Sequence, residues 1–451
     1  MLTQANLKAF RESIRGASFC PGDAEYDAAR TIPNAMIDRR PGVIVRCAGA
    51  ADVVGSVRFA REQGALLSVR GGGHSVAGKS VCDGGVMIDL SAMKGIRVDA
   101  TDRTARAEPG LTLGEFDRET QAFGLATALG VVSKTGIAGL TLGGGYGHLH
   151  GKYGLALDNV LSLDAVLADG RLVTATPTEN PDLYWGLRGS GGNLGVVTSL
   201  LYRVHEVGPV LGGGVFFAIP QMRDVLRFIR GFSAKIPDEL AIQGIALTHP
   251  EIGPVFGVAV CYCGPISAGE KVLKPLRSFG KPVADIIGPM PLVQLQGMFD
   301  PFFPPGRYTY VKSSFIQELT DEAIDVLAEF AASRPSPLVF APGIEHWHGA
   351  ATRVGPTETA FPHRTHQYNF MAWSTWTETA DTERHVRWTR QFWEAMKPHL
   401  APGSYVNYLS DDDDGAAKIA FGPNYDRLLA LKNKYDPTNL FRMNHNIRPT
   451  A

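Results

Sequence analysis

Three glycine-rich turns constrain this chain more than any other feature of its sequence. They read RGGGHSVAG from Arg70, GLTLGGGYG from Gly139 and GLRGSGGNLG from Gly186. Consecutive glycines remove every Cβ from a turn, so that backbone N–H groups can line a concave surface suited to a diphosphate. Because the three turns fall within about 130 residues, we expect one large ligand to touch all of them.

The glycine turns do not match the dinucleotide-binding fingerprint of nicotinamide enzymes. No G-x-G-x-x-G segment opens a helix with an acidic residue about 20 positions further on. Taken alone, each turn is also compatible with a bulge or a tight bend. His74, directly after the first turn, is by local rules either an ordinary polar turn residue or a group presented to the ligand.

Charge and length indicate the kind of partner. The chain has 451 residues, which is too long for a single compact core and favours two domains. Its 44 Lys and Arg nearly balance 45 Asp and Glu, so we expect neither a nucleic acid nor a membrane surface as partner, but a small molecule. The N-terminal residues lack the apolar run of a signal peptide, and the expected location is cytoplasmic.

The sequence predicts no metal site. Its five cysteines form no CxxC pair, and Cys261 and Cys263 are interpreted as half-buried free thiols. The acidic run from Asp411 to Asp414 is interpreted as a solvated loop, because a metal site there would need ligands from elsewhere in the chain.

Apolar periodicity predicts an α+β fold with two different halves. Short apolar runs between glycine, aspartate and asparagine turns characterise residues 41–207 and indicate strands. Beyond about residue 210, helix-like segments alternate with strand-like ones, which favours helices covering one face of an antiparallel sheet. We place one domain at 1–207, a second at 208–400, and a C-terminal segment at 401–451.

Eight motifs in a fixed order make the chain resemble a known family. They are RGGGHSVAG, DGGVMIDLSAMKGIRVD, ARAEPGLTLGEF, TLGGGYGHLHGKYGLALDNVLSLDAVLADGRLV, NPDLYWGLRGSGGNLGVVTSL, TAFPHR, SYVNYLSD and YDPTNLFRMNHNI. The chain is identified on them as a member of the berberine-bridge-enzyme-like FAD-linked oxidases of the vanillyl-alcohol-oxidase superfamily, with bacterial character. The resemblance implies a two-part FAD-binding domain of the PCMH type, with its core at about 37–207, a substrate domain, and a C-terminal segment that returns to the flavin.

The resemblance assigns a covalent flavin to His74. In the family, the histidine after the first glycine turn is bonded to the 8α carbon of the flavin, and a neutral imidazole is a suitable nucleophile for that carbon. Many relatives add a cysteinyl bond, but Val132 stands at that position and cannot form a thioether. The expected cofactor is therefore FAD attached through His74 alone. Thr135 matches a position that influences the access of dioxygen.

The same resemblance supplies the other flavin contacts. With His74 and Thr135, the expected cofactor residues are Arg70, Gly71, Gly72, Gly73, Ser75, Gly78, Gly136, Gly139, Thr141, Gly144, Gly145, Gly147, Asn193, Gly195, Val196, Tyr405 and Asn407.

The expected catalytic residues are Tyr146, Tyr405 and Tyr408, any of which would assist proton removal. A tyrosine titrates near 10, so a base role needs a nearby cation or hydrogen bonds, for which Lys152, His148 and His150 are candidates. If residues 405–408 form a strand, Tyr405 shares a face with Asn407, and Tyr408 lies on the other face or at a bend.

Two family positions differ on the strand after TAFPHR. Relatives carry a Lys and, two residues later, a Gln or Glu; here those positions hold Asn369 and Met371. We expect these two side chains to share the face toward the substrate pocket, and the carboxylate base to be missing. The neighbouring aromatic residues Phe370, Trp373 and Trp376 are expected mostly in the core.

The sequence thus predicts an FAD-dependent oxidoreductase that takes a hydride from a small hydrophobic or aromatic alcohol, phenol or biosynthetic intermediate. The electron acceptor is dioxygen or another oxidant. Two alternatives stay open: a carbohydrate oxidase acting on the anomeric hydroxyl, and a flavin-binding scaffold or cyclase without net redox turnover.

Overall fold

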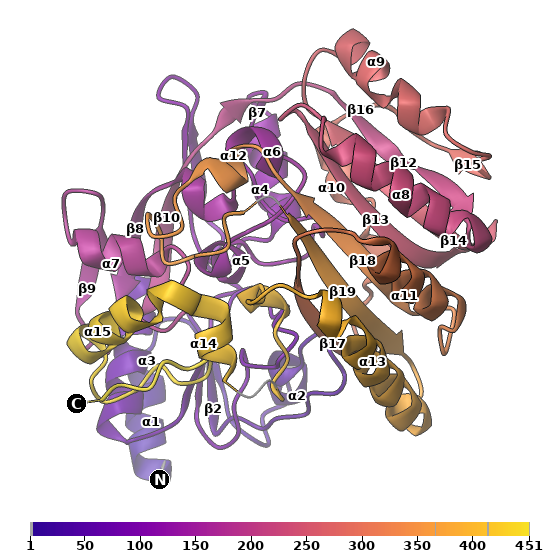
Figure 1. The fold of residues 1–451 in the computed structure, drawn as a ribbon. Helices are drawn as coiled ribbons and strands as arrows, with labels where there is room; N and C mark the ends of the chain where they lie inside the picture. The colour runs from indigo at the N-terminus through magenta and orange to yellow at the C-terminus, as the bar shows by residue number, and fades with distance from the viewer. Residues whose placement is uncertain (1–2, 366, 413–414, 451) are drawn as a thin grey trace.

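The structure is a computed structural model that describes residues 3–365, 367–412 and 415–450. Its first part contains a four-stranded sheet that carries the first glycine turn (Figure 1). The strands lie in the order β1 (Ala17–Phe19), β2 (Val43–Arg46), β4 (Val86–Asp89) and β3 (Leu67–Arg70). The strands β2 and β3 run parallel to β4, because helix α3 (Ala50–Glu62) crosses over between them. The turn that holds His74 follows directly from the end of β3.

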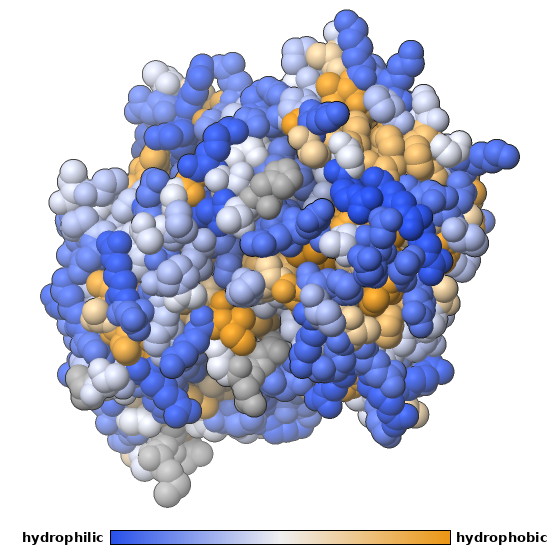
Figure 2. Space-filling view, viewed as in Figure 1, coloured by the Kyte–Doolittle hydropathy of each residue, from blue (hydrophilic) through white to orange (hydrophobic). Residues whose placement is uncertain are grey.

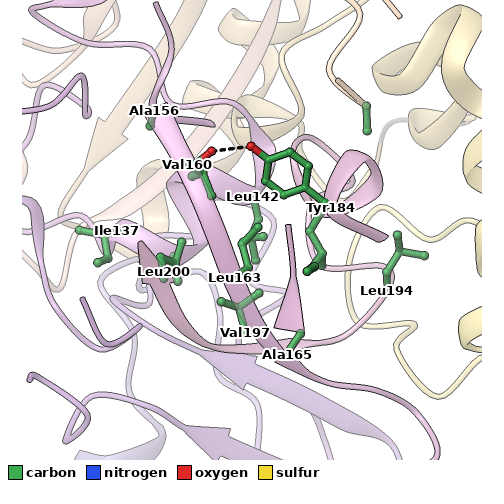
Figure 3. Close-up of a cluster of buried hydrophobic side chains, with 14 of the residues drawn as sticks. Ile137, Leu142, Ala156, Val160, Leu163, Ala165, Tyr184, Leu194, Val197 and Leu200 are labelled. Carbon is green, nitrogen blue, oxygen red and sulfur yellow. Dashed lines mark hydrogen bonds between the residues drawn. The ribbon is translucent and has the colours of Figure 1, made fainter. Parts of the chain in front are cut away.

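A five-stranded antiparallel sheet lies beside the first. Its order is β5 (Ile96–Asp99), β6 (Thr104–Ala107), β10 (Val196–Arg203), β8 (Val160–Val166) and β9 (Leu172–Ala175). Figure 3 shows apolar side chains of β8 and β10, such as Leu163 and Leu200, packing with Leu142 in a buried cluster. Within this cluster the Tyr184 hydroxyl donates to the carbonyl of Val160 at 2.7 Å. The second and third glycine turns flank this sheet, so its core fixes their positions.

Short elements complete the first part of the chain. They are α1 (Gln4–Ser13), α2 (Tyr26–Arg30), α4 (Leu113–Gln121), α5 (Ile137–Gly143), α6 (His150–Tyr153), α7 (Pro181–Leu187) and the two-stranded pair β7 (Leu125–Ala126) and β11 (His205–Glu206).

The middle of the chain forms an eight-stranded antiparallel sheet with one helix-covered face. Its order is β15 (Ala284–Asp285), β12 (Val210–Ala218), β14 (Gly253–Tyr262), β13 (Leu240–His249), β18 (Phe340–Trp347), β19 (Gln367–Trp376) and β17 (Tyr308–Ile316), with β16 (Gly288–Met290) also on β12. Figure 1 shows helices along one side, namely α8 (Met222–Ser233), α9 (Ile266–Arg277), α11 (Asp321–Ala332) and α13 (Thr382–Met396). The short helices α10 (Leu292–Gln296) and α12 (Ala350–Arg353) lie in the connections.

Strand alternation separates the two faces of this sheet. Ile344, Phe370 and Ala372 point into the apolar core under the helices. Their neighbours along β18 and β19 therefore point the other way, toward the first part of the molecule. The α+β class and the helix-covered antiparallel sheet predicted from sequence are confirmed, whereas the domain limits at 207 and 400 stay predictions.

The C-terminal segment returns to the first part of the chain. Helix α15 (Tyr425–Tyr435) lies beside α7 in Figure 1, and α14 (Ala416–Phe421) packs next to α15. A fully buried ion pair fixes the end of α15, where Lys432 Nζ lies 2.6 Å from Asp436 Oδ2 and also donates to the carbonyls of Asn193 and Phe441. Asp436 in turn accepts the backbone N–H groups of Leu440 and Phe441. This network holds the third glycine turn against the last residues of the chain.

The first two residues of the acidic run form ion pairs with other parts of the chain. Asp411 pairs with Lys79 and with Arg39, both of the first part of the chain. Asp412 lies 2.9 Å from Lys312 Nζ on β17 and accepts a hydrogen bond from the Tyr310 hydroxyl. Asp411 and Asp412 are exposed, as the interpretation as a solvated loop requires, but their ion pairs also connect the C-terminal segment to both halves; Asp413 and Asp414 lie outside the described residues.

The molecular surface is mostly polar on the face drawn in Figure 2, with hydrophobic side chains in scattered patches. Among the described helices, none has the length and apolar character needed to cross a membrane. The described residues contain no cluster of His, Cys, Asp or Glu able to hold a metal ion. The cytoplasmic location stays a prediction.

Replacing Asp436 by Asn tests the buried ion pair. The substitution leaves the buried Lys432 ammonium without a counter-charge, so we expect the free energy of unfolding to fall by about 3–5 kcal/mol, measured by urea denaturation. Glu383→Gln is the matched control, because Glu383 and Arg387 form an equally spaced pair on α13 that is exposed to solvent. The control should change stability by less than about 0.5 kcal/mol, and equal losses in both variants would contradict the assignment.

Candidate active site

A cavity of about 380 Å³ lies between the glycine turns and the open face of the eight-stranded sheet. Four parts of the chain line it: the turns of the first part, the segment before β17 that holds Phe303 and Arg307, side chains of β13, β17, β18 and β19, and the C-terminal segment. The C-terminal residues are Val406, Asn407, Tyr408, Leu409, Phe441, Met443, Asn444 and His445. Of the expected cofactor residues, those on the cavity wall are Gly71, Gly72, Gly73, His74, Ser75, Thr135, Gly136, Gly139, Gly195, Val196 and Asn407. Tyr146, Tyr408 and Met371 also line it.

The floor of the cavity is built from two chain segments in backbone contact. A Cβ placed on Gly72 would lie 2.3 Å from the nitrogen of Gly136, and a Cβ placed on Gly136 would lie 2.3 Å from the nitrogen of Gly72. Gly73 adds a left-handed backbone with φ of 73°. Only glycine allows this approach, and the side-chain-free surface that results fits the diphosphate and ribityl chain of an FAD.

Several expected cofactor residues lie behind the cavity wall. Arg70 is engaged with buried Asp89, its Nη2 lying 2.6 Å from Oδ2, and Thr141 hydrogen-bonds the Tyr202 hydroxyl at 2.8 Å. Asn193 joins the third turn to the C-terminal segment, since its side chain binds the carbonyl of His445 and the N–H of Ile447. Gly78, Gly144, Gly145 and Gly147 are also absent from the lining. Cofactor roles for all of these stay predictions.

His74 faces the cavity in the form that a nucleophile needs. Its Nδ1 lies 3.3 Å from the carbonyl oxygen of Gly72. Burial lowers the pKa of the imidazole below its ordinary value, against a smaller raising effect of the Gly72 carbonyl and of Asp300. The ring is therefore neutral near pH 7. Val132 also lines the cavity, and its side chain has no group able to form a covalent bond to a cofactor.

Tyr405 supports the second glycine turn from below. Its hydroxyl accepts the N–H groups of Gly145 at 2.8 Å and Tyr146 at 3.3 Å, and the Asn407 amide at 2.9 Å. A Cβ on Gly144 would lie 2.8 Å from its ring. Burial raises the pKa of Tyr405 to about 12 despite these donors. The ring is not part of the cavity lining, so its contacts position the turn.

The backbone around Tyr405 differs from the strand considered above. Residues Val406–Tyr408 form a 3₁₀ turn, because the chain turns here to pass beneath the cavity. Tyr408 lies at this bend and, with Val406 and Asn407, faces the cavity.

No cation among the described residues lowers the pKa of Tyr146. Its ring stacks on Trp347 with centroids 5.1 Å apart, and its hydroxyl donates to the carbonyl of His346 at 3.4 Å. Lys152 pairs instead with Glu239. Burial lowers the pKa of His148 to about 4 and that of His150 to about 3, so both rings are neutral. Burial accordingly raises the pKa of Tyr146 well above its ordinary value.

Glu345 is a residue of the cavity wall that the sequence did not indicate. It lies on β18 opposite Asn369 of β19 and Gln243 of β13, on the face away from the helices. Its side chain accepts the Tyr408 hydroxyl at 2.8 Å through Oε1 and the Asn369 amide at 2.9 Å through Oε2. The position that holds a carboxylate in relatives is Met371 here, as predicted, and the neighbouring strand β18 adds the carboxylate of Glu345 to the same cavity.

The buried environment of Glu345 changes the pKa of its carboxyl group. Only 1% of the residue is exposed. Burial raises the pKa of the carboxyl to about 7, although the hydrogen bonds from Asn369 and Tyr408 act in the opposite direction. In the sequence it is a single acidic residue in the apolar strand segment FAPGIEHW, and that pattern alone does not mark it as a site residue.

An aromatic wall extends along the sheet from Tyr408. The Trp373 ring lies 6.0 Å from that of Tyr408 and 5.5 Å from that of Phe303, which in turn lies 5.5 Å from Phe340. Met371 and Trp373 line the cavity, whereas Asn369 lies beneath Glu345 on the same face. Trp373, expected in the core, is therefore part of the cavity wall.

Two family models and several known proteins are similar to this chain. A family model described as an FAD binding domain matches residues 41–176, and one described as berberine and berberine like matches 404–448. An FAD-linked oxidoreductase of Dictyostelium discoideum is 33% identical, covering 98% of this chain and 97% of its own. A chitooligosaccharide oxidase of Gibberella zeae is 28% identical over 95% of this chain and 92% of its own.

A solved structure agrees over nearly the whole chain. The crystal structure of 6-hydroxy-D-nicotine oxidase from Arthrobacter nicotinovorans superposes with a TM-score of 0.89 at 28% identity, covering 96% of this chain and 98% of that one.

Replacing Gly72 by Ala tests the backbone contact under the cavity. The added methyl would force the two turns apart, and we expect destabilisation of about 1–3 kcal/mol together with loss of most of the bound flavin, measured as visible absorbance per protein. Gly231→Ala in α8 is the control, since its Cβ would meet no atom within 4 Å; it should be neutral or slightly stabilising. Full flavin content in Gly72→Ala would show that the contact is dispensable.

Proposed function

Since the chain belongs to the FAD-linked oxidoreductases of the berberine-bridge-like family, we propose that it oxidises a C–H bond beside an oxygen or nitrogen of a small hydrophobic molecule. The proton of the reacting hydroxyl or amine passes to Tyr408 and Glu345. The observation that carries this proposal is the buried carboxylate of Glu345, 2.8 Å from the only tyrosine hydroxyl that we find joined to it among the described residues.

The two residues act as a relay. With Glu345 ionised, the Tyr408 hydroxyl points its hydrogen at Oε1 and leaves its lone pairs toward the cavity. A substrate hydroxyl that donates to Tyr408 then loses its proton to the phenol oxygen as the phenol proton moves to Glu345. Asn369 holds the second carboxylate oxygen and so fixes the orientation of the acceptor. Burial and Glu345 raise the pKa of Tyr408 well above its ordinary value, so the carboxylate is the final base.

FAD bound in this cavity would accept the hydride of the substrate and, in an oxidase, pass both electrons to dioxygen. The residues present fit this cofactor: the glycine floor would hold the diphosphate and ribityl chain, and His74 would attach the flavin covalently through a ring nitrogen. Dioxygen as the acceptor rests on the oxidase relatives, and peroxide formation during turnover would support it over another oxidant.

The cavity wall favours an aromatic or apolar substrate over a sugar. Met371, Trp373, Phe303 and Phe340 present apolar surface next to Tyr408, and pockets lined in this way bind apolar ligands by burying their surface. The carbohydrate alternative retains the support of the chitooligosaccharide oxidase relative. A panel of aromatic alcohols and of oligosaccharides, scored by bleaching of the flavin, separates the two; rapid bleaching by sugars alone would reject our preference. Bleaching by neither group would favour the scaffold alternative.

Glu345→Gln tests the proton relay. The amide preserves shape and cannot accept a proton, so we expect the rate of flavin reduction by substrate to fall by about 10²–10⁴-fold, measured by stopped-flow absorbance. Glu318→Gln, at an exposed position after β17, is the matched control and should reduce at the wild-type rate.

The pH profile distinguishes this base from a tyrosinate. Because Glu345 accepts a proton only when ionised, the wild-type reduction rate should rise with pH through about 7 and Glu345→Gln should lose that rise. A rise near or above 10 in the wild type would instead identify one of the tyrosines as the base, since burial raises the pKa of all three.

His74→Ala tests the attachment of the flavin. The wild type should retain yellow flavin after denaturation, whereas the variant should release it all, as seen by flavin fluorescence in denaturing gels. Release from the wild type, or retention in His74→Ala, would contradict the assignment.

A further inference from the structure

Arg307 is a cation of the cavity wall that has no anionic partner among the described residues. It follows the segment Pro304–Gly306 and directly precedes β17. Among the described residues no carboxylate lies within ion-pair distance of it, and its guanidinium makes one long hydrogen bond, 3.5 Å from Nη1 to the carbonyl of Phe302. The two arginines buried near the site behave differently, since Arg70 and Arg364 are both paired, with Asp89 and Asp158.

The backbone around Arg307 is hydrogen-bonded to the first part of the chain. Its carbonyl accepts the N–H of Ala35 at 2.9 Å, and the N–H of Gly306 donates to the carbonyl of Pro33 at 3.0 Å. Asn34 adds two side-chain hydrogen bonds, from its amide to the carbonyl of Thr309 at 3.0 Å and from the Thr309 N–H to its oxygen at 3.0 Å. The backbone of Arg307 is therefore fixed at the seam between the two parts of the molecule.

A partly buried guanidinium without a counter-charge is costly for the protein. Burial lowers the pKa of Arg307, and no acidic side chain acts in the opposite direction. Desolvating a cation is unfavourable unless an anion or several acceptors compensate it. Arginine is also the side chain best suited to a carboxylate, because its planar fork donates two parallel hydrogen bonds.

Arg307 and Glu345 lie at different levels of the cavity along strand β19. Glu345 is opposite Asn369 of β19, whereas Thr309, two residues after Arg307, is opposite Thr375. Six residues of a strand extend about 20 Å. Met371, Trp373 and the phenylalanines of the aromatic wall lie between these two levels on the cavity face.

We propose that Arg307 binds the carboxylate of an extended, largely apolar substrate whose opposite end is oxidised beside Tyr408 and Glu345. This inference rests on the proposed function for the position of the reacting end, and it adds the chemical class of the substrate: a long aromatic or aliphatic acid. Arg307 is the residue that selects such an acid over its neutral analogue.

Binding without turnover tests the proposal. Phenylhexanoate and phenyldecanoate, each beside its primary amide, are titrated into the flavin-loaded protein by calorimetry. The wild type should bind at least one acid tenfold or more tightly than its amide, as expected for a charge-assisted hydrogen bond. Arg307→Met should lose this preference while it keeps its affinity for the amide, and Arg307→Lys should retain part of it. Arg384→Met, which removes an exposed arginine of α13, is the control and should keep the wild-type preference.

Four results would overturn the proposal: equal affinity of acid and amide in the wild type, no binding of either acid, an undiminished preference in Arg307→Met, or loss of flavin from that variant, which would make the arginine a cofactor contact. If Arg307→Met does not fold, the wild-type and Arg307→Lys titrations still decide between these results. The titrations measure binding and do not need oxidation of the probes. A failure of the Glu345 relay would therefore not affect the test of Arg307, and a failure of the Arg307 proposal would not affect the relay.

Discussion

The contact between Gly72 and Gly136 is the constraint on which the rest of the active site depends. Two chain segments that are far apart in sequence meet here without side chains, each nitrogen occupying the space that a Cβ of the other would need. The first segment ends the parallel strand β3 and the second begins helix α5. Their approach places His74 and Thr135 on one wall, so the chemistry of that wall is a consequence of a steric condition on the backbone.

Some buried charges of the protein are paired with an opposite charge, and others are not. Lys432 and Asp436 compensate each other completely, and their remaining hydrogen bonds go to backbone groups, which makes the pair a structural support for the C-terminal segment. Within the part of the chain that the structure describes, Glu345 and Arg307 lack such compensation: the carboxylate accepts hydrogen bonds from neutral donors, and the guanidinium donates to one carbonyl. Both uncompensated groups face the cavity, where a ligand can provide what the fold does not.

The last fifty residues connect the two halves of the site. Tyr405 supports the second glycine turn, Tyr408 reaches the carboxylate of the large sheet, and Asp411 and Asp412 pair with cations of both parts. The hydrogen bond between Tyr408 and Glu345, on which the proposed relay depends, therefore joins two elements brought together only by the return of the chain. This explains why a short 3₁₀ turn, and not a strand, occupies residues Val406–Tyr408.

The sequence by itself determined the fold class, the glycine turns and the tyrosines, because each has a local signature: apolar periodicity, consecutive glycines, or an ordered family motif. It also determined that Val132 offers no second covalent bond. It did not identify Glu345 or Arg307, since a single acid in an apolar strand and a single arginine after a proline pair carry no local signal of function. Strand register decided that Glu345 meets Asn369 and Tyr408, and the seam with residues 33–35 decided where Arg307 lies. Those pairings are long-range, and only the tertiary structure sets which buried charges remain without a partner.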